Sequence, residues 1–187
     1  ERGRTFDRVI MGTLRRHDET WKGIAQGLGV PVDAWPLLRT ERLNEYDSAA
    51  VIASVHPGPL PKPDTPELYR HHFQLLRVGL QAWMQGQAQP VGMPTYVDFR
   101  AGIAAVLDDI CRTSPGRVLL VSSGGPIATA VGLLLQTPAQ ATIELNFHIR
   151  NSAVTELSYR SKGHRLISYN TLNHLDSPQH QDWVTFT

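Results

Sequence analysis

The chain has 187 residues and a mass of 20.8 kDa, which is enough for one ordinary domain with a buried core and too little for two. Its 18 Lys and Arg residues against 17 Asp and Glu give a net charge of +1, which disfavours binding to nucleic acid or to an acidic membrane surface. Hydrophobic residues make up 41% of the chain, which argues against intrinsic disorder, and the single Cys111 excludes an internal disulfide and fits the reducing cytoplasm.

Neither a secretory signal nor a transmembrane helix is predicted. Residues 1–4 read Glu-Arg-Gly-Arg and offer no apolar stretch. The uncharged stretch over residues 118–143 is interrupted by a Ser-Ser-Gly-Gly-Pro turn and by Gln136, Pro138 and Gln140, so it indicates a buried strand, a turn and a core helix.

The first part of the chain predicts a strand, a helix and a long loop. Residues 6–11 form a short β-like run that ends at Gly12. Residues 14–28 carry apolar side chains at helical intervals, at Trp21, Ile24, Ala25 and Leu28, and Gly29 ends this helix. Five prolines between residues 57 and 66 then predict an extended surface loop, because each proline fixes φ and removes a backbone donor.

Two amphipathic helices follow this loop. The first begins with Thr65 as N-cap and Pro66 at the first helical position and ends near Gly86. The second begins at Thr95, with Asp98 as its capping-box partner. Their apolar faces consist of Phe73, Leu76, Leu80 and Trp83 in the first helix and of Tyr96, Phe99, Ile103, Val106 and Ile110 in the second.

The last third of the chain predicts a β-turn-α unit and a hairpin. Residues 114–116 turn the chain into Val118–Val121, whose continuous apolar run is typical of a central strand covered on both faces. A Gly-Gly turn leads from that strand into a helix over 126–135, and residues 153–159 and 165–169 alternate like the strands of a β-hairpin. Alternating strands and helices favour a three-layer α/β/α domain with a largely parallel central sheet, formed by residues 1–187 as one domain.

Ligands of such sheets bind beyond the carboxyl ends of the strands, where three segments carry suitable chemistry. Arg15 and Arg16 begin the helix after the first strand, and a guanidinium there could hold a phosphate, although a solvated helix start is the plainer interpretation. Glu45 lies in an acidic turn-like segment, Leu-Asn-Glu-Tyr-Asp, of a kind that is usually solvated. The small residues of Ser-Ser-Gly-Gly over 122–125 could present backbone N–H groups to an anion or could serve tight packing alone.

Taken together, these segments resemble the histidine phosphatase superfamily, also called phosphoglycerate-mutase-like, over most of the chain. Gly-Thr-Leu-Arg-Arg-His-Asp-Glu-Thr over 12–20 is similar to the family's S-P-L-x-R-x-x-x-T segment, with Arg16 at the phosphate-binding arginine and Thr20 at the threonine. Leu-Asn-Glu over 43–45 resembles the L-x-E segment, which places Glu45 at the usual proton donor. Val-Ser-Ser-Gly-Gly over 121–125 resembles V-S-H-G-G, with Ser123 at the family's second histidine.

The chain departs from the family pattern in two respects. The nucleophilic histidine of the family lies in an R-H-G motif, and none occurs among these 187 residues. Arg-His-Asp at 16–18 and Arg-His-His at 70–72 are the nearest imitations, but both lie in helical patterns, so His17, His71 and His72 are predicted to be surface residues. Residues 1–4 also resemble the end of the family's L-T-x-x-G segment, which normally opens a helix, yet the strand at residue 6 follows at once. We therefore expect segments before Glu1 and near Arg4 to be omitted from this chain. The second departure is Ser123, which cannot carry the charge of a histidine.

The resemblance implies a phosphomonoesterase, a metal-independent histidine-type acid phosphatase that works through a phosphohistidine on a small phosphorylated metabolite or phosphoprotein. In this scheme Arg16, Ser123 and Gly124 bind the phosphate, while Glu45 and Ser123 serve catalysis. No cofactor and no metal is expected, and the partner is a small phosphoester, with a homodimer left open. A phosphate- or phosphoester-binding protein of the same fold with weak or no turnover is the alternative.

Overall fold

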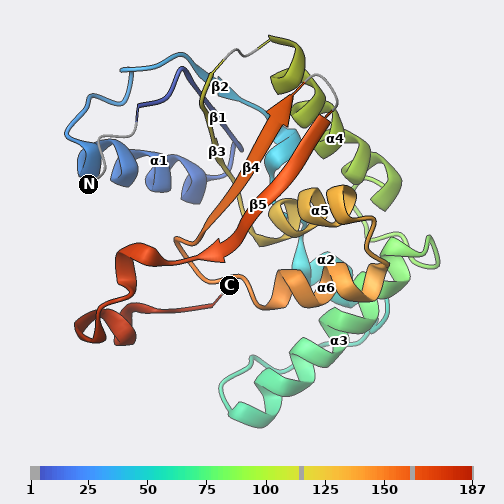
Figure 1. Cartoon of the computed structure of the whole chain (residues 1–187). Coiled ribbons are helices and arrows are strands. Elements are labelled where there is room, and N and C mark those ends of the chain that lie inside the picture. The colour runs from blue at the N-terminus through green and yellow to red at the C-terminus, as the bar shows by residue number, and fades with distance from the viewer. Residues whose placement is uncertain (1–4, 114–115, 161–162, 187) are drawn as a thin grey trace.

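Three short parallel strands form the sheet of the computed structural model, which describes residues 5–113, 116–160 and 163–186 (Figure 1). The strands are β1 (Arg8–Met11), β2 (Leu37–Arg39) and β3 (Val118–Val121), in the order β2-β1-β3. Both pairings are parallel, with Val9 opposite Leu37 and Leu119. The predicted parallel sheet is therefore confirmed, although β2 was not predicted as a strand.

The central strand of this sheet is β1, so the prediction that Val118–Val121 is central is wrong for the described residues. Val9, Ile10 and Met11 of β1 are at most 2% exposed, whereas only Val121 of β3 is fully buried. A continuous apolar run indicates that both faces of a strand are covered by other elements. It does not indicate whether the strand has a neighbouring strand on one side or on both, because that depends on how the rest of the chain folds.

One face of the sheet is covered by α1 (Arg15–Leu28). Trp21 and Ala25 of this helix pack against Val9 and Met11 of β1. The helix ends at Gly29, whose φ of 69° is left-handed, as the sequence predicts for a glycine C-cap.

The opposite face is covered by α4 (Tyr96–Thr113), whose Val106 and Ile110 pack against Ile10 of β1. Alternate side chains of β1 thus enter the two apolar layers, as the pleat of a strand requires. The predicted cap of α4 is confirmed: Thr95 Oγ1 accepts a hydrogen bond from Asp98 N at 3.1 Å and donates one to Asp98 Oδ2 at 2.7 Å. Helix, sheet and helix together make the expected three-layer α/β domain.

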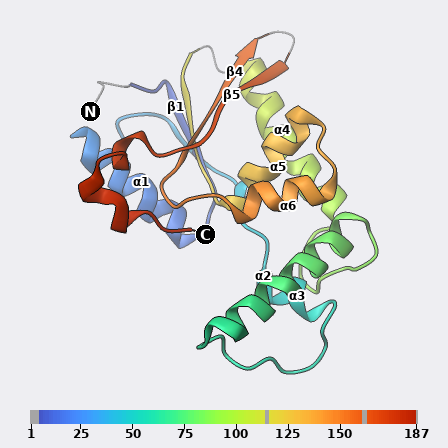
Figure 2. The same ribbon diagram turned by 60° about the horizontal axis from the view of Figure 1, so that its bottom comes forward.

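Four further helices pack beside these layers (Figure 2). They are α2 (Ser48–Ala53), α3 (Pro66–Met84), α5 (Gly124–Leu135) and α6 (Ala139–Phe147). The predicted N-cap of α3 is confirmed, since Thr65 Oγ1 accepts from Leu68 N at 3.2 Å. Leu80 and Trp83 of α3 lie in a third apolar cluster with Val51. Phe73 stays 45% exposed, with its ring edge-on against that of Phe147.

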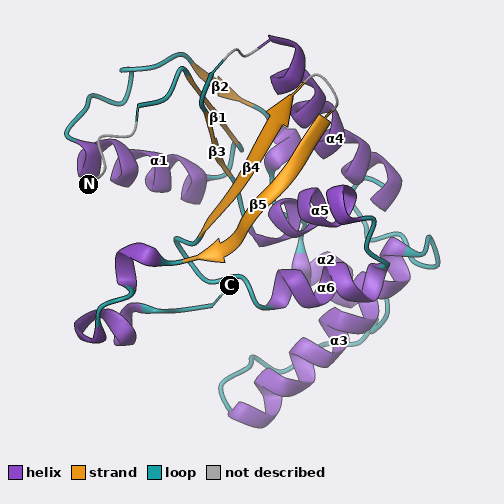
Figure 3. Cartoon of the chain, in the orientation of Figure 1, coloured by secondary structure: helices purple, strands orange, loops and turns teal. Residues whose placement is uncertain are grey.

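The C-terminal part contains the predicted hairpin, formed by β4 (Val154–Arg160) and β5 (Gly163–Thr171) (Figure 3). This antiparallel pair is a separate sheet that contacts α4 and α5 through β5. Short 3₁₀ helices occur at Glu41–Leu43, Asn173–Leu175 and Pro178–Trp183. The predicted turns at 114–116 and 161–164 lie partly outside the described residues. None of the helices in the described ranges is long and apolar enough to cross a membrane.

Candidate active site

Two strand ends lie side by side at the carboxyl edge of the sheet. Met11 of β1 is paired with Val121 of β3, and the N–H of Gly12 donates to the Val121 carbonyl at 3.1 Å. The chain leaves β1 into α1 and leaves β3 into α5, so the first turn of α1 faces the first turn of α5. This adjacency follows from the parallel pairing, as the sequence predicts for the two turns.

Arg16 and Ser123 meet across this edge. Arg16 Nε donates a hydrogen bond to Ser123 Oγ at 2.9 Å, although the two residues are 107 positions apart in the chain. The Nη groups of Arg16 make no hydrogen bond with another described residue, and the side chain lies at the surface. The guanidinium is thus oriented through Nε while its outer N–H groups remain free to bind an anion bidentately.

His17 lies directly beneath this contact. Its Nε2 is 2.7 Å from Ser123 Oγ, in a hydrogen bond whose donor depends on the tautomer, and the residue is only 1% exposed. Burial and the positive charge of Arg16 lower the pKa of His17, partly opposed by the Gly12 backbone. The prediction that His17 is a surface residue is therefore wrong.

The cause of this error is visible in the helix. His17, Trp21 and Ala25 follow each other at intervals of four and form the buried stripe of α1. The sequence pattern already included Trp21 and Ala25, and extending it by one turn places His17 on the same face. His71 remains exposed and His72 half-buried, with Nδ1 of His72 bonded to the Leu68 carbonyl.

The carboxyl of Glu45 also lies at the first turn of α5. Its Oε2 and Oε1 accept hydrogen bonds from the Gly125 N–H at 3.0 and 3.1 Å, in the first turn of α5. Burial raises the pKa of this carboxyl, while the N–H groups of Gly125 and Tyr46 and the charge of Arg16 act in the opposite direction. A carboxyl with a raised pKa is suited to donate a proton near neutral pH.

Three side-chain hydrogen bonds hold the segment of Glu45 against the strand ends. Asn44 Oδ1 accepts from the Thr13 N–H at 2.7 Å, and Asn44 Nδ2 donates to Thr13 Oγ1 at 2.7 Å. Ser122 Oγ donates to the Leu43 carbonyl at 2.8 Å. These contacts fix the position from which Glu45 projects, a role for Asn44 and Ser122 that the sequence did not reveal.

Asp47 has a different role from Glu45. Its carboxylate caps α2 by accepting from the N–H groups of Ala49 and Ala50, at 2.9 and 3.1 Å. Of the acidic pair in this segment, only Glu45 thus lies at the candidate site. The Asp47 side chain serves the helix N-terminus.

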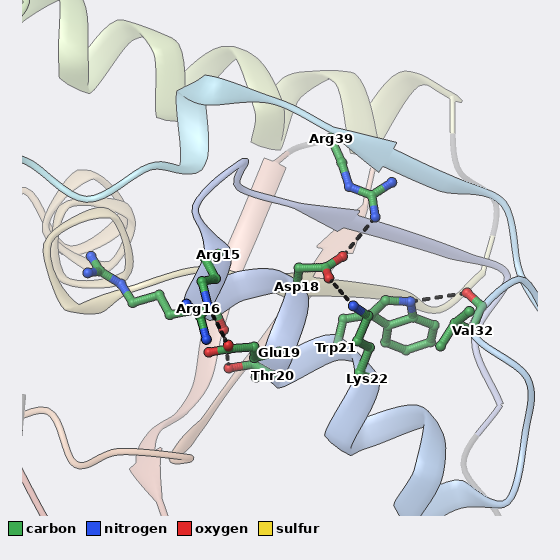
Figure 4. A network of polar contacts seen from close by, with 9 residues as sticks. All are labelled: Arg15, Arg16, Asp18, Glu19, Thr20, Trp21, Lys22, Val32 and Arg39. Atoms are coloured by element: carbon green, nitrogen blue, oxygen red, sulfur yellow. Dashed lines mark hydrogen bonds and ion pairs between the residues drawn. The ribbon is translucent and has the colours of Figure 1, made fainter.

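Asp18, Arg15 and Thr20 of α1 contact partners other than Ser123. Asp18 lies between Lys22 and Arg39, at 2.7 and 2.9 Å, and links α1 to the end of β2 (Figure 4). Arg15 is largely exposed and pairs with Glu19 on its own helix. The pair of Arg15 and Glu19 thus belongs to a solvated helix surface, the plainer interpretation that the sequence allowed for Arg15 and Arg16. Thr20, at the position of the family's threonine, donates its hydroxyl proton to the Arg16 carbonyl at 2.7 Å.

The N-terminus of α5 completes the arrangement. Gly124 and Gly125 form its first turn, rather than a turn before the helix as expected. Gly124 is buried, and its N–H has no hydrogen-bond partner among the described residues, so it remains available to an anion. A cluster of His, Cys, Asp and Glu able to hold a metal ion is not found in the described ranges.

The site therefore combines a guanidinium held through Nε, a helix N-terminus, a hydroxyl and a carboxyl with a raised pKa. Guanidinium and backbone N–H groups are the donors that bind phosphate oxygens in proteins, and a carboxyl acid can protonate an ester leaving group. Arg16, Ser123, Gly124 and Glu45, all selected from the sequence, converge at this edge of the sheet. Chemically, the arrangement is suited to bind and process a phosphate monoester.

Comparison with known proteins agrees with this description. Residues 2–172 match the family model of the histidine phosphatase superfamily (branch 1), so the chain belongs to that superfamily. A search of curated protein sequences gives no match.

Solved structures show the same fold. An alpha-ribazole phosphatase from Shigella flexneri is 15% identical, with a TM-score of 0.57 over 89% of this chain and 74% of that one. A phosphoserine phosphatase from Entamoeba histolytica, in complex with phosphoserine, is 18% identical, with a TM-score of 0.56 over 91% and 76%. A mycobacterial glucosyl-3-phosphoglycerate phosphatase is 20% identical, with a TM-score of 0.53 over 87% and 76%. At these identities the likeness shows the fold alone.

Proposed function

We propose that this protein is a metal-independent phosphomonoesterase that hydrolyses a small phosphorylated metabolite or phosphoprotein through a phosphohistidine. The observation that carries the proposal is the contact between Arg16 Nε and Ser123 Oγ at 2.9 Å, which leaves the outer guanidinium N–H groups beside the N-terminus of α5. Family membership supports the reaction type, and the three phosphatases of the same fold act on different phosphate esters.

Each residue has a defined task in this reaction. Arg16 and the Gly124 N–H hold the phosphoryl oxygens, and Ser123 donates a hydrogen bond in place of the histidine that the family pattern has at this position. Glu45 protonates the leaving oxygen, for which its raised pKa is suited. The reaction also requires a nucleophilic histidine, which lies in the R-H-G motif of the family pattern. We propose that residues 1–187 form one domain around the site.

The experiment is a screen of the full-length protein against a panel of phosphoesters, with and without EDTA. We expect EDTA-resistant phosphate release. Brief reaction with a ³²P-labelled substrate should trap a label that is stable in alkali and lost in acid, as expected for a phosphohistidine.

Arg16→Ala and Arg15→Ala are the matched pair for this assay. Arg16→Ala should lower kcat/KM by at least about 100-fold, because two charged hydrogen bonds are worth roughly 3 kcal/mol or more. Arg15→Ala should stay within about twofold, since the Arg15 side chain is largely exposed and pairs with Glu19 on its own helix. Equal losses in both variants would show that the phosphate binds elsewhere.

A non-catalytic phosphate- or phosphoester-binding protein is the second candidate, favoured by the neutral Ser123 at the position of a histidine. It predicts that inorganic phosphate binds to the wild type and not to the Arg16→Ala variant, while no ester of the panel is turned over.

A further inference from the structure

The position of Ser123 creates a chemical problem for the proposed function. A hydroxyl is a neutral and short donor, whereas an imidazole at this position would reach further and could carry charge. The structure nevertheless places an imidazole here, because His17 of α1 approaches Ser123 from below. Its Nε2 lies 2.7 Å from Ser123 Oγ.

We propose that His17 is the positioning residue of the phosphate site and acts on the bound phosphoryl group through Ser123. The inference rests on the proposed function. Ser123, at the start of α5, replaces the histidine of the family pattern, and His17 of α1 supplies an imidazole beside it. His17 of α1 and Ser123 at the start of α5 thus act together as one hydrogen-bond donor to the phosphate.

The hydrogen-bonding capacity of the Ser123 hydroxyl leads to this arrangement. The hydroxyl has one proton and two lone pairs, and one lone pair accepts from Arg16 Nε at 2.9 Å. An unprotonated phosphoryl oxygen can only accept, so the Ser123 proton must be directed to that oxygen when phosphate is bound. His17 must then donate from Nε2 into the second lone pair. Both nitrogen donors together orient the Ser123 O–H toward the ligand.

The packing of His17 is consistent with such a task. The ring is 1% exposed, and its Nδ1 is buried without a hydrogen bond of standard geometry to a described residue. It lies against Gly12, where any β-carbon would be 2.1 Å from Nδ1. A buried polar ring is costly unless it is hydrogen-bonded, and Nε2 of His17 has such a bond to Ser123.

The first test measures the binding of inorganic phosphate to the full-length protein by calorimetry. Ser123→Ala and His17→Phe should each weaken binding about tenfold, the cost of one hydrogen bond. His17→Gln should retain most of the affinity, because its amide can still donate to Ser123. The double variant His17→Phe/Ser123→Ala should be no weaker than Ser123→Ala, since both changes remove the same unit.

Trp21→Phe is the matched control. Trp21 is equally buried one turn further along the same helix, and its Nε1 donates to the Val32 carbonyl at 3.1 Å, away from the site. We expect a similar loss of stability with unchanged phosphate affinity. If His17→Phe binds phosphate as well as Trp21→Phe does, or if the two single losses multiply in the double variant, the inference is overturned. A wild type that binds no phosphate overturns the proposed function as well.

A second variant tests the same idea by moving the ring. His17→Ala should weaken phosphate binding about tenfold, and adding Ser123→His should restore it, because the vacated space accepts an imidazole from α5. In ¹⁵N spectra of the wild type, Nε2 of His17 should shift toward a protonated nitrogen when phosphate is added. Failure of the rescue in a folded double variant, or an unprotonated Nε2 in the phosphate complex, would refute the assignment.

Discussion

Gly12→Ala is the most direct perturbation of the contact beneath the site. The added β-carbon would lie 2.1 Å from His17 Nδ1 and 2.4 Å from His17 Cε1, and 2.8 Å from Asn44 Oδ1. The backbone of Gly12 is not left-handed, so the cost is steric alone. Contacts this short cannot persist, and the imidazole must leave its position.

The expected loss of stability combines two effects. Overpacking a filled site costs about 1–3 kcal/mol, and loss of the hydrogen bond between His17 and Ser123 costs about 1 kcal/mol. We therefore expect the free energy of unfolding to fall by about 2–4 kcal/mol in urea titrations at constant m-value. Phosphate binding should weaken together with it.

Gly23→Ala is the control on the same helix. Outside the backbone of the helix itself, no atom lies within 4 Å of the position that a β-carbon would take there. The residue is exposed in α1, so alanine should stabilise the protein by about 0.5–1 kcal/mol. If Gly12→Ala loses less than about 0.5 kcal/mol and the imidazole signals of His17 stay unchanged, the packing of His17 against Gly12 is refuted.

Three further results are expected. Glu45→Gln should abolish most of the ester hydrolysis. Because the folded-state pKa of Glu45 is raised above 4.5, the stability of the wild type falls as the pH rises through that pKa. In urea unfolding, the variant should therefore be more stable relative to the wild type at pH 8 than at pH 4. A stability difference that does not change with pH would contradict the assignment. Gly125→Ala should also reduce kcat/KM and cost about 1–3 kcal/mol of stability, since its β-carbon would lie 2.1 Å from Glu45 Oε1; unchanged kinetics would show that Glu45 is not needed there. Ser123→Ala should lower kcat/KM about tenfold and cost about 1 kcal/mol of stability, because the buried His17 loses its hydrogen bond to Ser123; an equal kcat/KM would exclude a contact of Ser123 with the phosphoryl group.

Local patterns in the sequence were sufficient to predict most elements of the fold. The stripe of Trp21 and Ala25, the caps at Thr65 and Thr95 and the apolar run Val118–Val121 each depend on neighbours a few residues away. Helices and strands impose fixed periods on such patterns, so the elements and their buried faces could be predicted. The parallel sheet followed from their alternation, and it placed Arg16 and Ser123 at the same edge.

The tertiary structure decided which remote groups meet. Packing of α1 against the sheet brings His17 to Ser123, 106 positions away. The hydrogen bonds of Asn44 and Ser122 hold the segment from which Glu45 reaches α5, while Asp47 caps α2. The place of β3 beside β1 was decided in the same way. A periodic pattern determines which face of an element is apolar, whereas the partner of that face depends on how all the elements pack at once. The helical period of α1 is enough to place His17 on the buried face, but only the packing of the whole fold brings that face to Ser123.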